Sequence, residues 1–383
     1  MFLREHDAKQ VLRAAGIPVP DGMLLTGAPF PNWSAPLPAE GWMVKAQVPG
    51  GGRGKMGGVR RAADWPAVLR ESRAMLGSVL GPHLVAAVRA EARVAGALEA
   101  YISLSVAPAK RMVRIMAAAQ GGVEIEALHA AGQVRTALSL PDACATAASC
   151  QALAAAIDGP AGASLAAAGA ALARAFVAHE LIMLEINPLF VLPDGGWVAG
   201  DAKMQTDDNA LDRNPGLQAM LAENEAAYPA PHLKWRYDFD YVVLDEAGEI
   251  GLLTTGAGLS MLLVDELRAR GLRPYNFLDV RTGGMNGSPD RLIQVLRWIA
   301  RGSRVRAVLC NIFAGATDLA EFARLLLAAR EAVLELRVPL VVRLVGNGLE
   351  GARTVLEDAG IGVTSDLEEA IARLVAVMGI AGV

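Results

Sequence analysis

Leu181-Ile182-Met183-Leu184-Glu185-Ile186-Asn187-Pro188-Leu189 predicts a buried β-strand with a polar end. Side chains alternate along a strand, so Glu185 and Asn187 are expected on the same face. Residues 190–199 predict a second strand after an Asp-Gly-Gly turn, and this hairpin folds Asp201 back toward Asn187. Two carboxylates and an amide oxygen are hard ligands suited to Mg²⁺ shared with nucleotide phosphates. An ordinary hairpin with polar ends is the alternative that this stretch alone leaves open.

Length and composition indicate a folded chain with well-buried cores. It has 383 residues, 53% of them hydrophobic, and a formal net charge of -4, which allows two or three domains. The small net charge gives no general attraction for nucleic acid, so a polyanion needs a local site. The three cysteines are scattered without metal-ligand spacing, which indicates a reducing compartment.

The sequence predicts no membrane segment. Charged residues between Arg4 and Lys9 exclude a signal-peptide core there. The longest uncharged stretch rich in alanine and glycine, residues 159–173, is expected to be too short and too glycine-rich to span a bilayer. We therefore expect a cytoplasmic protein with neither a nucleic-acid nor a membrane partner.

A glycine-rich loop with flanking cations follows a predicted strand at residues 42–48. The strand carries Lys45 in apolar surroundings, and residues 50–58 contain six glycines together with Arg53 and Lys55. Amides without a neighbouring Cβ can approach phosphates closely, and the cations add positive charge. The loop lacks the Gly-Lys-Ser/Thr ending of a Walker loop. The pattern favours a phosphate site, with a mobile glycine turn as the alternative.

The rest of the first half predicts mixed helices and strands. Glu91 and Glu99 flank a short link and are candidates to accept hydrogen bonds from a nucleoside, although glutamates of this kind are commonly only solvated. Residues 120–126 predict a turn that leads into a strand. The other expected elements are helices at 1–16 and 64–80, strands at 84–91 and 100–106, and alanine-rich helices across 141–180 with a break near 158–160.

After residue 236 the chain alternates regularly between apolar strands and amphipathic helices. This alternation predicts a doubly wound parallel sheet, with ligands at the carboxyl ends of its strands. Residues 254–258 and 311–318 each join a strand to a helix, where free amides and hydroxyls can hold an anion. Thr317 or Asp318 is the expected helix cap, and a purely structural cap explains each loop equally well by itself. Strands are expected at 241–244, 250–253, 275–280, 307–313, 340–345 and 361–364, and helices at 259–270, 289–301, 318–335, 349–359 and 366–378.

Taken together, these motifs resemble the β subunit of succinyl-CoA synthetase over essentially the whole chain. The resemblance implies an α/β protein with an N-terminal ATP-grasp nucleotide-binding domain, residues 1–236, and a flavodoxin-like CoA-ligase domain, residues 237–383. The motifs occur in the family's order: Ala8-Lys9-Gln10, Val44-Lys45-Ala46-Gln47-Val48, the glycine loop 51–58, residues 121–126, 185–189 and 201–203, Asp208-Asn209-Ala210-Leu211, Gly256-Ala257-Gly258, Asn276-Phe277-Leu278-Asp279-Val280 and Asn311-Ile312-Phe313.

The resemblance also implies roles for individual residues. In this family the nucleotide is ATP or GTP, with Mg²⁺, and the catalytic residues are Glu185, beside a phosphorylated histidine, and Lys45. The implied phosphate ligands are Lys45, Gly52, Arg53 and Gly54; the implied adenosine ligands are Glu91, Val94 and Glu99; and the implied metal ligands are Asn187 and Asp201.

The family's reaction requires a second subunit. Its enzymes phosphorylate a histidine on a partner α subunit, pass the phosphoryl group to a carboxylic acid, and let CoA displace phosphate from the acyl phosphate. The α subunit also carries most of the CoA site. No histidine of this sequence stands in a matching motif, so the resemblance predicts that the chain works as an αβ complex in which positioning and charge neutralisation dominate catalysis.

The sequence departs from the family pattern in the acid-binding pocket. Thr255 replaces an asparagine, the loop after Phe313 is shortened to residues 314–318 and loses an arginine, and the turn that begins at Arg281 is longer. Changed charges alter carboxylate preference more than a changed methylene does. We therefore expect an acid other than succinate, either another dicarboxylate or a sulfonated carboxylate. The predicted acid-binding residues are Thr255, Gly256, Arg281, Gly315, Ala316 and Thr317.

Three alternatives remain at this level. The chain is an ordinary succinyl-CoA synthetase β subunit, a carboxylate–amine ligase that shares the ATP-grasp half, or a non-catalytic subunit that only senses nucleotide. The doubly wound second domain argues against the amine ligase. The presence of Lys45, Glu185, Asn187 and Asp201 argues for phosphoryl chemistry.

Overall fold

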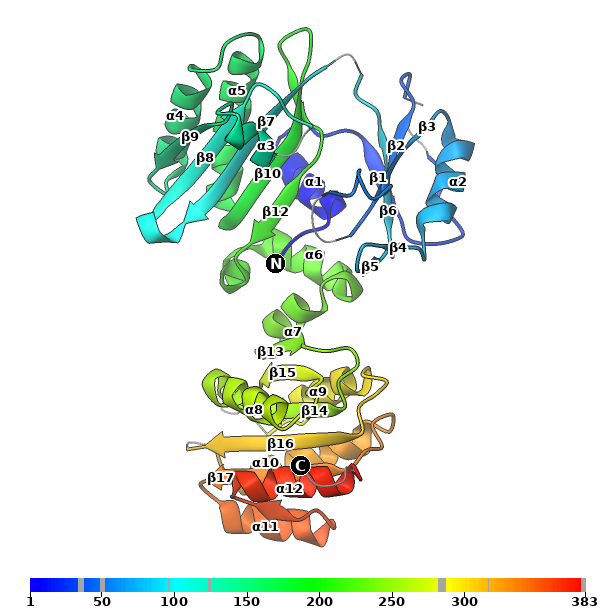
Figure 1. Cartoon of the computed structure of the whole chain (residues 1–383), viewed down its shortest axis with the longest axis vertical. Helices are drawn as coiled ribbons and strands as arrows, with labels where there is room; N and C mark the ends of the chain where they lie inside the picture. Colours follow the sequence, from blue (N-terminus) through cyan, green and yellow to red (C-terminus); the bar gives the residue numbers. More distant parts are fainter. Residues whose placement is uncertain are drawn as a thin grey trace. The chain divides into compact units, whose positions relative to one another are not determined.

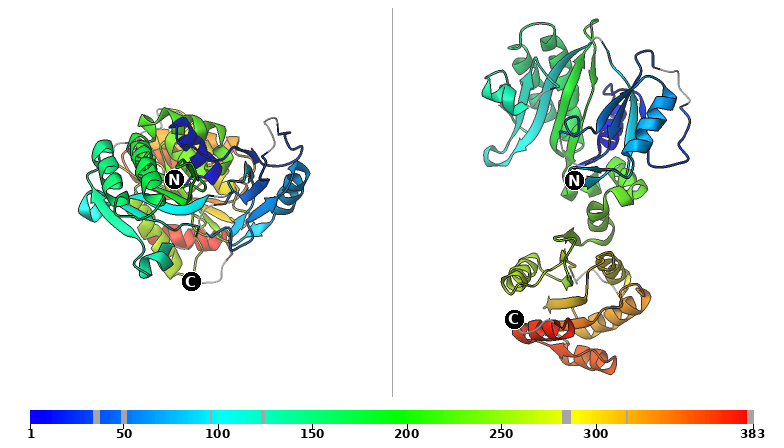
Figure 2. Two further views of the ribbon diagram at one scale, coloured as in Figure 1. Left: turned by 90° about the horizontal axis from the view of Figure 1, so that it is seen from above. Right: turned by 45° about the vertical axis from the view of Figure 1, so that its right-hand side comes forward.

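The computed structural model describes residues 1–33, 38–48, 52–95, 97–122, 125–281, 287–315 and 317–379. Its chain forms two compact units, Met1–Met220 and Leu221–Val383 (Figures 1 and 2). The domain boundary expected between residues 236 and 237 falls within helix α7, Pro229–Tyr237, which packs on the first strand of the second unit. That boundary stays a prediction, and each unit is described by itself.

The first sheet of unit 1 is small and antiparallel. Its strand order is β1-β6-β2-β3, and helix α2, Trp65–Met75, packs against it. Asp64 caps α2 by accepting a hydrogen bond from the amide of Ala67 at 2.8 Å. The strands are Gly22–Leu25 (β1), Trp42–Ala46 (β2), Val59–Ala62 (β3) and Val88–Ala92 (β6), and Val79–Leu80 (β4) pairs separately with His83–Leu84 (β5).

A larger, antiparallel sheet forms the other half of unit 1. Its order is β11-β10-β7-β8-β9, with β12 also pairing with β10. The strands are Leu98–Ala107 (β7), Met112–Ala118 (β8), Arg135–Ser139 (β9), Leu181–Val191 (β10), Trp197–Ala199 (β11) and Lys203–Thr206 (β12). Helices α4, Ala143–Ala154, and α5, Ala161–Ala178, lie on one face of it (Figure 1). The expected break near 158–160 is confirmed.

Helix α5 corrects one argument from the sequence. The helix extends to 18 residues and is apolar enough to span a bilayer by length and composition. The length of this helix therefore does not exclude a membrane span, contrary to the prediction for residues 159–173. Leu165, Leu172 and Phe176 are buried against α4, β7 and β10. This packing is that of a core helix.

Three further predictions for unit 1 were wrong in detail. Helix α2 ends at Met75 and residues 79–80 form strand β4, although a helix was expected over 64–80. The first helix, α1, spans Glu5–Ala14, because Phe2 and Leu3 instead pair with the edge of β12. Residues 125 and 126 belong to a short helix, α3, Ile125–Ala130, where a strand was expected. Helix α1 lies between the two sheets (Figure 1). The 3-10 turn Pro108–Lys110 joins β7 to β8, and unit 1 ends with the 3-10 turn Asp208–Arg213 and the start of helix α6, Pro215–Glu223.

Unit 2 contains the predicted parallel sheet. Strands β14-β16-β17-β18 are parallel, and β15 lies beside β14, so the order β15-β14-β16-β17-β18 is the flavodoxin-like 2-1-3-4-5 arrangement. Strand β13 pairs antiparallel with β15, which corrects the expectation of a wholly parallel sheet. The strands are Asp240–Val243 (β13), Ile250–Thr254 (β14), Asn276–Asp279 (β15), Ala307–Ala314 (β16), Leu340–Gly346 (β17) and Val363–Thr364 (β18).

Helices cover both faces of this sheet, as the alternation predicts. One core packs α8 and α12 against Ile250, Leu252 and Leu309, and the other packs α9, α10 and α11 against Val308 and Cys310. Neighbouring residues of one strand thus face opposite cores, which is why the strands are apolar without interruption. The helices are Ala257–Ala269 (α8), Asp290–Ala300 (α9), Leu319–Ala332 (α10), Leu349–Asp358 (α11) and Leu367–Val377 (α12).

Candidate functional site

A cavity of about 890 Å³ lies in unit 1 and is lined by residues from both of its sheets. The small sheet contributes β2, β6 and the described part of the glycine loop, and the large sheet contributes β10 and the turn before β12. All the predicted nucleotide and metal residues line this cavity: Lys45, Gly52, Arg53, Gly54, Glu91, Val94, Glu99, Glu185, Asn187 and Asp201.

The hairpin that begins at β10 has the predicted geometry. Leu184 and Ile186 are fully buried, whereas Glu185 and Asn187 between and after them line the cavity, as the alternation of a strand requires. Strands β10 and β11 pair in antiparallel register, and the amide of Gly200 donates to the carbonyl of Pro188 at 3.0 Å. The turn therefore returns the chain to the end of β10.

The oxygens of Asn187 and Asp201 fit the donor set of Mg²⁺. Asn187 Oδ1 accepts a hydrogen bond from the amide of Gly122 at 2.7 Å, and Asp201 Oδ1 accepts one from the amide of Ala202 at 2.8 Å, which orients both side chains. Nη2 of Arg53 lies 2.9 and 2.8 Å from the two carboxylate oxygens of Asp201. A carboxylate and an amide oxygen on one cavity wall can hold Mg²⁺ together with phosphates.

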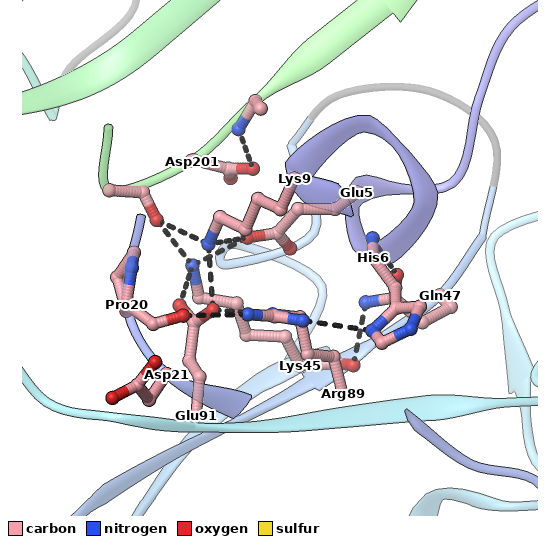
Figure 3. A network of polar contacts seen from close by, with 12 residues as sticks. Glu5, His6, Lys9, Pro20, Asp21, Lys45, Gln47, Arg89, Glu91 and Asp201 are labelled. Atoms are coloured by element: carbon pink, nitrogen blue, oxygen red, sulfur yellow. Dashed lines mark hydrogen bonds and ion pairs between the residues drawn. The ribbon is translucent and has the colours of Figure 1, made fainter. Parts of the chain in front are cut away.

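Lys45 is held in a buried network at the cavity wall (Figure 3). Its Nζ lies 2.8 Å from Oε1 of Glu5 and 2.7 Å from Oε1 of Glu91, and it donates to the carbonyl of Gly200 at 3.0 Å. Burial by itself lowers the pKa of Lys45, but the attraction of Glu5 and then Glu91 outweighs burial and raises that pKa. Lys45 therefore keeps its positive charge in the cavity.

A second layer of charged residues surrounds Lys45, and sequence reasoning missed it. Lys9 Nζ donates to Glu5 at 2.6 Å, to Glu91 at 2.7 Å and to the carbonyl of Gly200 at 2.8 Å. Arg89 Nε donates to Glu91 at 2.6 Å. Glu5 and Lys9 are one helical turn apart on α1, a spacing that predicts an ion pair but gives no sign of the cavity.

Glu91 has a different environment from the one expected of a nucleoside ligand. It is 2% exposed, and its oxygens already contact Lys45, Lys9 and Arg89. This geometry favours orientation of the lysines, and the contact with adenosine stays a prediction. Glu99 is exposed and lies so close to Gly122 that a Cβ there would meet its carboxylate at 1.8 Å. Gly122, with φ of +71°, is thus required where Asn187 is oriented.

His6 belongs to the same network. Nη1 of Arg89 donates to Nδ1 of His6 at 2.8 Å, and the backbone amide of His6 donates to Gln47. Burial, followed by repulsion from Arg89, lowers the pKa of His6 to about 4. The ring is neutral near pH 7, as its role as a hydrogen-bond acceptor requires.

The predicted acid-binding loops of unit 2 meet at one edge of its sheet. Thr255 and Gly256 follow β14, and Gly315 and Thr317 follow β16, the neighbouring parallel strand. Thr255 is mostly buried, while Gly256 and Gly315 are exposed. These strands lie at the point where the strand order reverses, the usual ligand position in such sheets. Ala316 lies outside the described residues.

Local hydrogen bonds fix both loops. The amide of Gly256 donates to Oδ1 of Asp279 at 2.8 Å, and Asp318 caps α10 by accepting from the amide of Ala320 at 2.8 Å, which confirms one of the two expected caps. Arg281 lies in the left-handed region with φ of 45° and pairs with Asp238 and Asp240. Its recognition of an acid stays a prediction.

Comparisons with known proteins agree with this architecture. Residues 2–191 match the family model of the ATP-grasp domain, and residues 253–377 match that of the CoA-ligase domain. The chain is 37% identical over 383 aligned residues to the succinate–CoA ligase [ADP-forming] subunit β of Thiobacillus denitrificans, covering 95% of this chain and 96% of the relative. It is 32% identical over 379 aligned residues to the protein of the same name from Gemmatimonas aurantiaca, covering 98% of each.

A solved structure shares the fold. ATP citrate lyase from Methanothrix soehngenii, in complex with citrate and coenzyme A, superposes with a TM-score of 0.70 at 17% identity, covering 95% of both chains. Fold, cavity and family models together define an ATP-grasp CoA ligase. The chain belongs to the family of ADP-forming succinate–CoA ligase β subunits and is the β subunit of an ADP-forming acid–thiol ligase.

Proposed function

We propose that this β subunit binds ATP with Mg²⁺ in the cavity of unit 1 and activates a carboxylic acid for transfer to CoA in the cytoplasm. One observation carries the proposal: Lys45 and Arg53 from the small sheet line the same cavity as Asn187 and Asp201 from the large sheet. Phosphoryl transfer needs cations and metal ligands around one phosphate chain, and little else from the protein.

Each group has a distinct task in this proposal. Lys45 and Arg53 bind the phosphates, and the amides at Gly52 and Gly54 allow close approach of the backbone. Asn187 and Asp201 hold Mg²⁺, which neutralises charge on the phosphates when it is bound. Glu185, on the same face of β10 as Asn187, orients the acceptor histidine. Val94 and Glu99 line the cavity where they can contact the nucleoside.

The proposed acceptor is a histidine on an α subunit. The relatives are named as β subunits, which implies such a partner, and His6 of this chain is engaged with Arg89 as a neutral acceptor. The α subunit also supplies most of the CoA site in this proposal. A phosphohistidine then transfers its phosphoryl group to the carboxylate, and the CoA thiolate displaces phosphate from the acyl phosphate.

The proposed acid is a dicarboxylate other than succinate or a sulfonated carboxylate. Support comes from the buried Thr255 and exposed Gly315 at the ligand edge of the unit 2 sheet, where the loop sequences depart from the succinate pattern. Arg281, Gly256 and Thr317 complete this proposed site. The names of the relatives favour the alternative that succinate itself is the substrate.

Reconstitution with the cognate α subunit tests the proposal. ATP labelled at the γ-phosphate should label a histidine of the α subunit, and the β chain alone should stay unlabelled. ADP release is then measured with CoA and a panel of succinate, other dicarboxylates and sulfonated carboxylates. A stable phosphohistidine on the β chain would contradict the proposed partner. The highest kcat/KM with succinate would contradict the proposed acid while leaving the CoA-ligase activity intact.

A further inference from the structure

Glu5 connects two cations of the nucleotide cavity. Its Oε1 accepts a hydrogen bond from Lys45 Nζ at 2.8 Å, and its Oε2 lies 2.8 Å from Nη2 of Arg53. Glu5 is the first residue of α1, is 4% exposed and itself lines the cavity. The single carboxylate thus contacts a cation on β2 and a cation on the glycine loop.

Two carboxylates compete for the same nitrogen of Arg53. Nη2 lies 2.8 Å from Glu5, and 2.9 and 2.8 Å from the two oxygens of Asp201, while Nη1 donates to the carbonyl of Ala46 at 3.0 Å. Nη2 has two hydrogens for these three oxygens. Asp201 is also a ligand proposed for Mg²⁺. At the proposed metal site, Mg²⁺ would therefore compete with Arg53 for the carboxylate of Asp201.

We propose that Glu5 is a positioning residue that retains Arg53 in the cavity wall when Asp201 turns to Mg²⁺. With Glu5 present, Arg53 keeps a carboxylate partner after the exchange, and its released N–H is available to a nucleotide phosphate. Without Glu5, Arg53 depends on Asp201 and competes with the metal for it, because a buried guanidinium without a partner is costly. The inference rests on the proposed function, since it takes Asp201 as a metal ligand.

The remaining contacts of Glu5 keep it charged and fixed. Burial raises the pKa of Glu5, but Lys45, Lys9 and Arg53 outweigh burial and hold that pKa well below its usual value. Lys9 joins Glu5 to the carbonyl of Gly200, the residue before Asp201. The charge on Glu5 is therefore present throughout the neutral range, and α1 is tied to the turn that carries Asp201 (Figure 3).

The Mg²⁺ dependence of nucleotide binding tests this role. ADP is titrated calorimetrically into the αβ complex at a series of Mg²⁺ concentrations. In Glu5→Gln, the Mg²⁺ concentration at half-maximal ADP affinity should rise about tenfold, the order expected for loss of one charge-assisted contact. The matched control is Asp7→Asn on the same helix, because Asp7 is a buried carboxylate whose described ion pair is with Arg4. It should leave the Mg²⁺ midpoint unchanged.

A double-mutant cycle separates positioning from a general structural effect. Arg53→Gln removes the competitor for Asp201, so Glu5→Gln should leave the Mg²⁺ midpoint unchanged in that background. An equal shift in both backgrounds, or no shift in Glu5→Gln alone, overturns the inference. If Glu5→Gln does not fold, Glu5→Asp is used in its place. The shorter side chain withdraws the carboxylate from Arg53, so the Mg²⁺ midpoint should still rise. An unchanged Mg²⁺ midpoint overturns the inference.

Asp201→Asn distinguishes this failure from failure of the proposed function. If Asp201→Asn leaves the Mg²⁺ dependence as in the wild type, the proposed metal site itself is wrong. If Asp201→Asn abolishes that dependence while Glu5→Gln has no effect, the metal site stands and the role of Glu5 alone is rejected.

Discussion

The two candidate sites of this chain are built in different ways. In unit 1, Lys45, Glu5 and Glu91 are buried and make ion pairs within 2.8 Å around a cavity. In unit 2, the predicted acid site is a sheet edge with exposed glycines, and the side chain of Arg281 is 44% exposed where it pairs with two aspartates. One site is a preorganised charge network, and the other is a pair of loops.

In the proposed function, this difference assigns the phosphoryl step to unit 1 and the choice of acid to unit 2. A buried network fixes the positions of charges before a ligand arrives, which suits phosphoryl transfer. Exposed loops can change length and composition without loss of the fold, so they suit a part of the enzyme that varies with the acid. We therefore predict that substitutions at the unit 1 site lower activity with every acid. Substitutions at the unit 2 site should instead change the relative kcat/KM values for different acids.

The largest predicted effect compares Lys45 with Arg281 directly. Lys45→Met should destabilise unit 1 by about 3–5 kcal/mol, because it leaves Glu5 and Glu91 buried with one fewer cation. Arg281→Ala should destabilise unit 2 by under about 1 kcal/mol, because exposed ion pairs contribute little. The urea dependence of hydrogen exchange in β2 and β6, and in β13 and β15, measures the two effects separately. Equal losses in the two units would remove the distinction between the sites.

The second effect concerns activity without loss of stability. Asp201→Asn should lower phosphorylation of the α-subunit histidine at least about a hundredfold, the order seen when one preorganised charge-stabilising group is removed. The effect should be the same for every acid, because it precedes acid activation. Asp194→Asn is the matched control, since Asp194 lies in the exposed turn of the same hairpin and accepts only from the amide of Gly196 among the bonds described for its side chain.

The outcome for Asp201 depends on both variants. Asp194→Asn should phosphorylate the partner at the wild-type rate, and both variants should melt as the wild type does. Normal phosphorylation by Asp201→Asn would remove Asp201 from the proposed metal site. A loss with Asp194→Asn as well would show that the hairpin, and not the Asp201 carboxylate, is what the reaction requires.

Most of the fold follows from local patterns in the sequence. In unit 2, apolar strands alternate with amphipathic helices, and each expected element lies within a few residues of the observed one. The antiparallel pairing of β13 could not be predicted, because strand direction depends on a partner distant in the chain. Residues 125–126 were misassigned since a short alternation there fits a strand as well as the first turn of α3.

The cavity was predictable only for residues within recognisable motifs. Lys45, Asn187 and Asp201 stand in a glycine-loop strand and a hairpin, both of which have local signatures. Glu5 and Lys9 have the spacing of an ordinary helical ion pair. Lys9 also contacts Glu91, which lies 82 residues further along the chain. Such long-range charge contacts depend on tertiary packing, which sequence spacing does not specify.

A third predicted effect is a pH dependence of the stability of unit 1, which His6 causes. Because the pKa of His6 is lowered to about 4 from 6.5, the unfolded chain binds a proton that the native ring rejects between these values. The contribution of His6 to the stability of unit 1 is therefore fully present above pH 6.5 and declines as the pH falls toward 4. The slope from His6 should approach about 1.4 kcal/mol per pH unit.

His6→Gln provides the control for this pH dependence. Its amide oxygen can still accept from Arg89, but the side chain no longer titrates. The difference in stability of β2 and β6 between pH 6.5 and pH 5 should shrink in the variant, as measured by the urea dependence of hydrogen exchange at each pH. If the stability difference between the two pH values is the same in the variant and the wild type, groups other than His6 cause the pH dependence.

The smallest predicted effect tests the acid specificity of unit 2. Thr255→Asn restores the residue that the resemblance associates with succinate, at the end of β14, where Thr255 is 8% exposed. An added side-chain amide should raise kcat/KM for succinate relative to the preferred acid by about tenfold, the order of one recovered hydrogen bond. Phosphorylation of the α-subunit histidine should stay unchanged, because the cavity of unit 1 is intact. A parallel loss of histidine phosphorylation would mean that Thr255 supports more than acid choice, and the separation of the two sites by function would then be wrong.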